Sequence, residues 1–308
     1  MIRLDAGNDI LLLDADDGVV LDLARRLWSE TDVTAPHPFE VVLRTSGSLP
    51  DADPEESLEW KVSGNDVRLA APGLRLSVRP YEGRAEGTVA RGLASARPDL
   101  VVRLLLETPV TAMKMLRQQL LHAGAVVGSR GAVVIRGAAG AGKSTLVAAC
   151  WASGLGLLGD ESLLVRRDEP DRLEATLRDL TLTERSTELL GLESATAPAL
   201  SGGERKRRVP LLATARPSDR LAPRAATVLL GRREPGPARL VPLTADAFVK
   251  GFPEGEIPQE RRYGGRPDVT AWAWAGRETY RLGGAADLTG AVHLVSKLAG
   301  LERPGDQI

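Results

Sequence analysis

The stretch "GAVVIRGAAGAGKSTLVAACWASG", residues 131–154, decides the fold that the sequence predicts. It begins with a run rich in β-branched side chains (131–137), which is typical of a buried strand, and it ends with apolar residues at helical spacing (144–154). Between them the glycines and a lysine follow the spacing G-x-x-x-x-G-K-[ST]. A strand, a glycine-rich loop and a helix in this order predict backbone N–H groups that point inward at phosphate oxygens.

The residues of this predicted phosphate loop have separate tasks. Lys143 carries a charge that can reach the β- and γ-phosphates of a nucleotide, and the Ser144 hydroxyl can ligate Mg²⁺. The helix that follows adds the partial positive charge of its N-terminus. We therefore expect ATP and Mg²⁺ as ligands. The residues expected to contact the nucleotide are Gly137, Ala138, Ala139, Gly140, Ala141, Gly142, Lys143, Ser144 and Thr145.

Composition limits the classes of partner. The chain has 308 residues, of which 43% are apolar, and this favours two domains with full cores. The net charge of −1, from 40 basic and 41 acidic residues, predicts no global field that recruits nucleic acid or an anionic membrane. A single cysteine excludes an internal disulfide, and neither a signal peptide nor a long apolar run is visible. We expect a cytoplasmic protein, and the sequence leaves open a homo-oligomer.

The pattern of apolar and polar residues changes near residue 97. Residues 1–96 hold one helical stretch and then short alternating runs, which predict a small α+β domain with an antiparallel meander that binds the substrate or a partner. Residues 97–308 predict an α/β nucleotide-binding domain. Its expected elements are helices at 99–107, 111–121, 244–251 and 287–300, strands at 155–165 and 225–234, and loops at 231–240 and 251–268; Trp272 and Trp274 have strand spacing.

Two adjacent acids follow the loop lysine by one helix and one strand. Asp160 and Glu161 end the apolar run "GLGLLG", which places them at the C-terminal edge of a strand beside the phosphate loop. Open α/β sheets bind their ligands at this edge. Carboxylates there can hold Mg²⁺ or accept a proton.

Residues 116–190 resemble the catalytic core of the HPr kinase/phosphorylase family and its relatives found beside peptide-modification genes. A weaker resemblance to the same family is present near the C-terminus. His122 stands where the family has a histidine shortly before the phosphate-loop strand. The phosphate loop and the pair of adjacent acids also match. The resemblance implies a P-loop kinase domain of the HPr kinase type, with a small N-terminal α+β domain before it.

The resemblance also implies roles for individual residues. In the family the two acids serve as a metal ligand and as the base that deprotonates a serine hydroxyl, and the base is the second acid, here Glu161. The residues themselves leave open which acid is the base, and they favour the shorter Asp160 as the metal ligand together with Ser144. His122 would orient an acid or the transferring phosphoryl group, and Arg178 would contact substrate or phosphate. The chain differs from HPr kinases in having Thr145 after the loop serine and glutamate as the second acid. The resemblance therefore carries the fold and the phosphoryl-transfer chemistry and leaves the acceptor open.

The run "LSGGERKR" (200–207) is close to the signature of ABC-type ATPases. Those ATPases need an apolar strand that ends in Asp-Glu soon after the signature, and none follows here. We interpret the run as a glycine-rich loop that carries a basic cluster.

Two hypotheses of function remain. The first is an ATP-dependent kinase that transfers the γ-phosphoryl group to a hydroxyl, most simply a serine of a peptide or protein, with a small-molecule acceptor as a variant. The second is a nucleotide-binding switch or regulatory ATPase without kinase activity. A kinase needs a carboxylate within reach of an acceptor hydroxyl, whereas a switch needs only the loop and a metal ligand.

Overall fold

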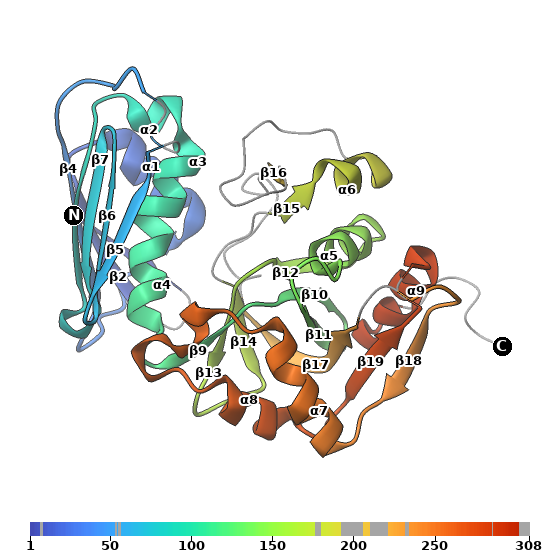
Figure 1. The fold of residues 1–308 in the computed structure, drawn as a ribbon. Coiled ribbons are helices and arrows are strands. Elements are labelled where there is room, and N and C mark those ends of the chain that lie inside the picture. The colour runs from blue at the N-terminus through green and yellow to red at the C-terminus, as the bar shows by residue number, and fades with distance from the viewer. Residues whose placement is uncertain are drawn as a thin grey trace. The chain divides into compact units, whose positions relative to one another are not determined.

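The computed structural model describes residues 1–6, 9–52, 54, 57–175, 180–191, 206–209, 221–231, 234–284 and 286–301. The chain divides into two compact units, Met1–Leu116 and Arg117–Ile308, and each contains helices and a mixed β-sheet (Figure 1). The fold is therefore of the mixed α/β kind. Among the described residues, every helix is too short or too polar to span a bilayer.

The first unit is built on an eight-stranded sheet with the order β3-β1-β2-β4-β8-β7-β6-β5. Its strands are β1 (Ile2–Asp5), β2 (Ile10–Ala15), β3 (Ser29–Glu30), β4 (Phe39–Thr45), β5 (Glu59–Ser63), β6 (Asp66–Ala71), β7 (Leu74–Arg79) and β8 (Arg84–Val89). Its helical segments are α1 (Gly18–Leu27), η1 (Pro80–Glu82), α2 (Leu93–Ala96), α3 (Pro98–Val101), the π-helical η2 (Val102–Glu107) and α4 (Thr108–Lys114).

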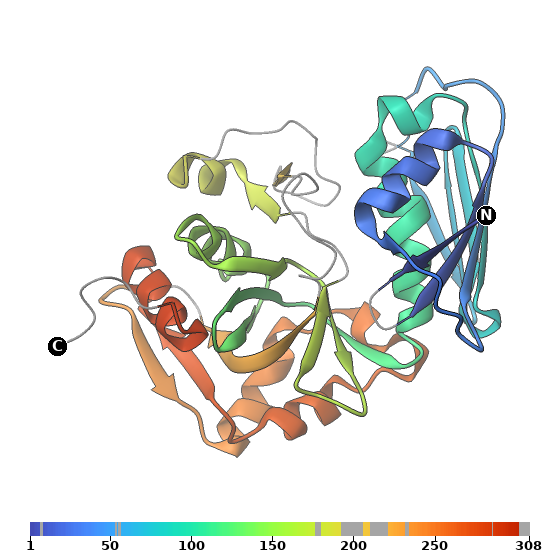
Figure 2. The same ribbon diagram turned by 180° about the vertical axis from the view of Figure 1, so that it is seen from behind.

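The alternation of buried and exposed side chains along the strands explains how this sheet forms one side of the core. In β4 the residues Phe39, Val41 and Leu43 are buried while those between them are more exposed, as the two-residue period of a strand requires. Helices α1 and α4 pack on one face of the sheet, as the two opposite views of the unit show (Figures 1 and 2). The predicted antiparallel meander is confirmed for β5 to β7, and β8, which was not predicted, extends it. The sheet as a whole is mixed, because β4 runs parallel to both β2 and β8.

The boundary between the units lies later than residue 97. The helical run from Pro98 to Lys114 belongs to the first unit, because α4 packs on β4, β7 and β8. Its apolar side chains cover the open face of that sheet. Helix was expected as far as residue 121, but residues 118–121 form a strand of the second unit, where pairing with a neighbouring strand outweighs local helical spacing.

The second unit holds a nine-stranded sheet with the order β12-β10-β11-β17-β14-β13-β9, to which β19 and β18 are added beside β17. The strands are β9 (Gln118–Leu121), β10 (Gly124–Gly128), β11 (Gly131–Gly137), β12 (Gly156–Gly159), β13 (Leu163–Arg166), β14 (Arg172–Ala175), β17 (Leu221–Leu230), β18 (Arg239–Pro242) and β19 (Thr279–Gly283). A two-stranded sheet is formed by β15 (Leu180–Thr183) and β16 (Lys206–Val209).

Helices lie on both faces of the larger sheet (Figure 1). They are α5 (Lys143–Ala152), α6 (Glu184–Leu189), α7 (Ala245–Gly251), η4 (Phe252–Gly255), η5 (Pro258–Gly264), α8 (Pro267–Trp274) and α9 (Leu288–Ala299). Val133 and Ile135 of β11 pack in one core with α5 and α9, whereas Ala132 and Val134 pack in the other with α7 and α8. The unit therefore has three layers, with the sheet between two layers of helices. Strand β11 lies in the middle layer and is buried along its whole length.

Three local predictions about this unit are wrong. The apolar run 155–165 forms two strands, β12 and β13, because the chain turns between them at residues 160–162. Trp272 and Trp274 lie in helix α8, so that Trp274 is buried and Trp272 is 59% exposed. Two residues that share a face of a strand point to different sides of a helix. The segment 251–268, expected as loop, holds the short helices η4 and η5.

Candidate functional site

A glycine-rich loop joins the central strand β11 to helix α5. Gly140 and Gly142 have φ of +76° and +96°, a left-handed region that favours glycine, and Gly142 directly precedes the helix. Ala138 to Gly140 are exposed at the tip, where the Ala141 N–H bonds back to the Ala138 carbonyl at 3.2 Å. The predicted sequence of strand, loop and helix is thus present, with the open N-terminus of α5 facing the loop.

Lys143 folds back into this loop. Its side chain is buried, and Nζ donates to the carbonyl oxygens of Gly137 at 2.8 Å and Ala138 at 3.2 Å. The ammonium group therefore lies under the loop, at the start of a helix whose first N–H groups have no partner within the helix. Such a combination of a cation, inward N–H groups and a helix N-terminus can bind an anion.

Asp160 and Glu161 lie in the turn between β12 and β13. Glu161 has φ of +68°, which is unusual for a residue with a side chain, and the Ser162 N–H donates to the Asp160 carbonyl at 2.9 Å. Because the chain turns here, the two carboxylates are not forced to opposite faces as they would be in an extended strand. Asp160 is 2% exposed and Glu161 is half-buried.

The Asp160 carboxylate lies against β10 and helix α5. A β-carbon placed on Gly124 would lie 3.3 Å from Asp160 Oδ1 and 2.6 Å from Val147 Cγ2, so these three residues meet at one point. Val147 is three residues beyond Ser144 on α5, and residues at this spacing share a helix face. A carboxylate and a hydroxyl thus stand on the same side of α5, which is a donor set that suits Mg²⁺ when phosphate oxygens complete it.

His122 joins the two parts of the site. Its Nδ1 lies 2.9 Å from the Glu161 carbonyl oxygen. A carbonyl can only accept, so Nδ1 carries the hydrogen and Nε2 of the neutral ring keeps its lone pair. Burial, and secondly the positive charge of Lys143, lower the pKa of His122 below its ordinary value of 6.5. The imidazole is therefore neutral at pH 7.

A buried ion pair lies directly behind the loop. Arg136 and Glu260 are both completely buried and form two parallel hydrogen bonds, Nη1 to Oε1 and Nη2 to Oε2, each of 3.0 Å. Arg136 Nε donates to the Phe252 carbonyl at 2.7 Å, and its guanidinium carbon lies 4.3 Å from the centre of the Phe252 ring. The residue next to Arg136 in the chain is Gly137, the first of the loop.

The same glutamate holds His122. Glu260 Oε1 accepts the backbone N–H of His122 at 2.9 Å, and the Glu260 carbonyl accepts from the Gln119 side chain at 2.8 Å. Glu260 thus connects β11, the turn after β9 and η5. Glu260 was not among the predicted site residues, because it lies in a Pro- and Gly-rich segment without periodicity. The available signal was Arg136 itself, since a charged residue inside an otherwise apolar strand requires a buried partner.

Thr145 occupies a different position from the rest of the predicted loop residues. It is buried, and its hydroxyl lies 2.8 Å from the Ser186 hydroxyl, which in turn lies 2.9 Å from that of Thr183. Thr183 caps the N-terminus of α6. The Thr145 side chain therefore ties the first turn of α5 to α6.

The structure does not describe every predicted feature. Arg178 and most of the basic run 200–207 lie outside the described residues, although residues 206–209 form β16. Within the described part of the chain there is no cluster of three or more His, Cys, Asp or Glu side chains that could hold a metal ion by themselves.

No protein-family model matches this chain, and no curated protein sequence matches it.

Proposed function

We propose that this protein is an ATP-dependent kinase of the HPr kinase type that transfers the γ-phosphoryl group to a hydroxyl, most simply a serine of a peptide or protein. The observation that carries the proposal is the grouping around Lys143, which lies under the glycine-rich loop and close enough to His122 to lower the pKa of that residue. Glu161 contacts this histidine through its carbonyl oxygen, and Asp160 precedes Glu161 in the same turn. This grouping supports a site in which an anion-binding loop works together with two carboxylates.

The loop end of the site suits the phosphates of ATP. Lys143 would exchange its bonds to the two carbonyls for stronger, charge-assisted bonds to phosphate oxygens, with the loop N–H groups beside it. Ser144 and Asp160 would hold Mg²⁺, which on binding neutralises part of the phosphate charge. Thr145 would keep the helix N-terminus in place through Ser186.

The part of the site that holds Asp160 and Glu161 suits the hydroxyl group that would accept the phosphoryl group. Glu161 is only half-buried, so its carboxylate is accessible for taking the proton of an attacking hydroxyl as the oxygen forms its bond to the γ-phosphorus and the bond to the β–γ bridging oxygen breaks. His122 holds the Glu161 carbonyl and so fixes the turn that presents this carboxylate. Asp160, being buried against α5, is the better placed of the two acids for the metal.

The test compares Glu161→Gln and Asp160→Asn with the wild type. Transfer of labelled γ-phosphate from ATP to a mixture of serine-containing peptides is measured, and ATP binding is measured in parallel by calorimetry. Loss of a base typically slows the reaction by about 10²–10⁴-fold, so Glu161→Gln should lower kcat by this factor with little change in ATP affinity. Asp160→Asn should also raise the Mg²⁺ concentration that activity requires.

Asp246→Asn serves as the matched control, because Asp246 is an exposed acid on α7. This variant should transfer at the wild-type rate. If ATP binds but no peptide is phosphorylated by the wild type, or if both site variants transfer normally, the kinase assignment is wrong and a nucleotide-dependent switch takes its place.

A further inference from the structure

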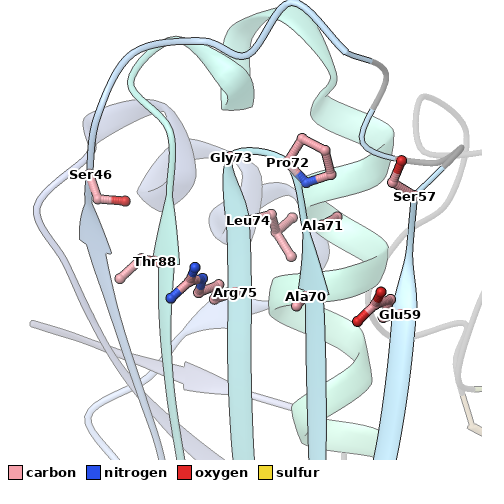
Figure 3. A pocket seen from close by; sticks show the side chains of 10 residues that line it. All are labelled: Ser46, Ser57, Glu59, Ala70, Ala71, Pro72, Gly73, Leu74, Arg75 and Thr88. Carbon is pink, nitrogen blue, oxygen red and sulfur yellow. The ribbon is translucent and has the colours of Figure 1, made fainter.

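Strand β5 forms an edge of the sheet in the first unit that no described strand covers. It is the last strand of the eight, pairs with β6 alone, and all five of its residues are exposed. An edge strand of this kind presents unpaired backbone groups to solvent and can receive one further strand. Figure 3 shows β5 from close by, with Glu59 on it and Ser57 just beyond its end.

The turn after β5 fixes which backbone groups point outward. Residues 64 and 65 connect β5 to β6, and Gly64 has φ of +59°, as expected for the first position of a two-residue hairpin turn. In such a hairpin the residues that flank the turn, Ser63 and Asp66, form a hydrogen-bonded pair, and bonding then alternates along the strand. The N–H and C=O groups of Trp60 and Val62 therefore face away from β6.

The side chains at the same two positions are apolar and accessible. Trp60 is 49% exposed and Val62 is 41% exposed. They stand opposite Leu69 and Val67 of β6, which are both buried. The apolar face of the sheet thus continues to its edge, where an added strand would bury it further.

On the opposite face of β5, which also carries Glu59, two positive charges meet directly across the strand pair. Lys61 stands directly opposite Arg68 of β6, and neither forms an ion pair with another described residue. Like charges across a strand pair are destabilising, and an acidic residue of an added strand at this position would relieve the repulsion. A hollow of about 660 Å³ lies on the sheet next to Glu59, lined also by Arg75 and Thr88, and offers space for a neighbouring side chain (Figure 3).

We propose that β5 docks an extended polypeptide segment that has an acidic residue opposite Lys61 and apolar residues opposite Trp60 and Val62. The segment would belong to the acceptor of the phosphoryl group, and this second statement rests on the proposed kinase function. A second copy of the chain fits less well, because antiparallel pairing of β5 with itself over its full length would place Lys61 opposite Lys61.

Binding is tested with the full-length protein and a fluorescent peptide whose core is Thr-Val-Glu-Val-Thr. This core reads the same in both directions and so suits either strand orientation. The control peptide has lysine in place of the glutamate. We expect the glutamate peptide to bind about threefold to tenfold more tightly than the lysine peptide. The variant Lys61→Glu should reduce or reverse this preference.

A proline substitution tests the backbone pairing. Val62→Pro removes an N–H that the sheet does not use, and loss of this one hydrogen bond should weaken peptide binding by about threefold to tenfold. Val62→Ala keeps the N–H and separates this effect from loss of the side chain. Circular dichroism and thermal melting establish that each variant is folded, and Lys61→Glu tests the site independently if the proline variant is not.

Three outcomes would overturn the docking proposal. They are absence of binding by either peptide, equal binding of both peptides that Lys61→Glu leaves unchanged, and self-association that Val62→Pro abolishes, since the occupant would then be a second copy. To test the acceptor statement, the same core is joined to a serine-containing sequence. Val62→Pro should raise KM for this substrate and leave kcat and ATP affinity unchanged. Peptide binding without any phosphorylation would contradict the kinase function and leave the docking intact.

Discussion

The two units of the molecule differ in what their sheets bury. In the described part of the first unit, the only buried polar or charged side chains are those of Glu107 and Lys114. The second unit buries many more, and those of Arg136, Lys143 and Glu260 surround the end of one strand. Burial of charge is costly, so it persists where the groups satisfy one another. The contrast indicates that the second unit organises polar groups inside its fold, whereas the first unit presents its polar groups at the surface, as along β5.

Removal of the buried Glu260 carboxylate is the strongest test of this difference between the units. Glu260→Gln leaves the Arg136 guanidinium buried without its counter-charge, and we expect the free energy of unfolding to fall by about 3–5 kcal/mol. Urea denaturation followed by tryptophan fluorescence measures the change. Glu256→Gln is the matched control, because Glu256 pairs with the exposed Arg261 in the same segment, and an exposed pair contributes about 1 kcal/mol or less. Equal losses in the two variants would mean that burial of the first pair has no special importance.

A smaller effect is expected from Lys143→Ala, which tests whether the polar cluster serves a ligand. Loss of a charge-assisted contact to phosphate should weaken ATP binding by about 1.5–3 kcal/mol, or roughly tenfold to a hundredfold. Isothermal titration calorimetry measures the affinity. Lys250→Ala removes an exposed lysine on α7 and should leave the affinity unchanged. Unchanged ATP affinity in a folded Lys143→Ala protein would show that the loop is not a nucleotide site.

The smallest effect concerns the pH dependence of stability. The pKa of His122 is lowered in the folded protein, so between this lowered value and 6.5 the unfolded chain binds a proton that the folded chain does not. The contribution of His122 to stability is therefore complete above pH 6.5 and is lost as the pH falls below it. His122→Gln, which can still donate to the Glu161 carbonyl, should lose less stability than the wild type between pH 7.5 and about 5.5.

Melting temperatures across this range measure the difference, with His293→Gln on α9 as the control. Parallel pH profiles for the wild type and His122→Gln would contradict a buried neutral imidazole. The linkage between the loop, the turn at Glu161 and this ring would then need another explanation.

The elements nearest the loop could be predicted from the sequence because local rules dominate there. Residues 131–137 contain the apolar run of a buried strand, and the glycines at 140 and 142 have the left-handed conformation that the loop pattern requires. His122 and Glu161, which the resemblance indicated, contact each other, and Asp160 lies against helix α5, which follows the loop. Local pattern and tertiary environment agree at these positions, which is the condition under which sequence reasoning succeeds.

The features that escaped prediction depend on contacts between distant segments. The role of Glu260 depends on its ion pair with Arg136, which is distant in sequence. The short helix η5 that places Glu260 beside Arg136 has no periodic pattern in the sequence. Strands β1 and β2 contain or adjoin aspartates, which are rare in strands, yet their alternate leucines are buried. In the same way Trp272 and Trp274 fit either a helix or a strand until the packing of α8 decides.

The Arg136–Glu260 pair also sets an order of events during synthesis. The two residues are 124 positions apart, and at about 5–20 residues per second the ribosome adds the second about 6–25 s after the first. The first unit, whose sheet ends at Val89, can fold within that interval. Until η5 has been synthesised, the Arg136 guanidinium on the strand before the glycine-rich loop has no Glu260 carboxylate to pair with. A nascent chain therefore acquires its ligand-binding loop late, and a chain truncated before residue 260 would be a natural target for chaperones and proteases.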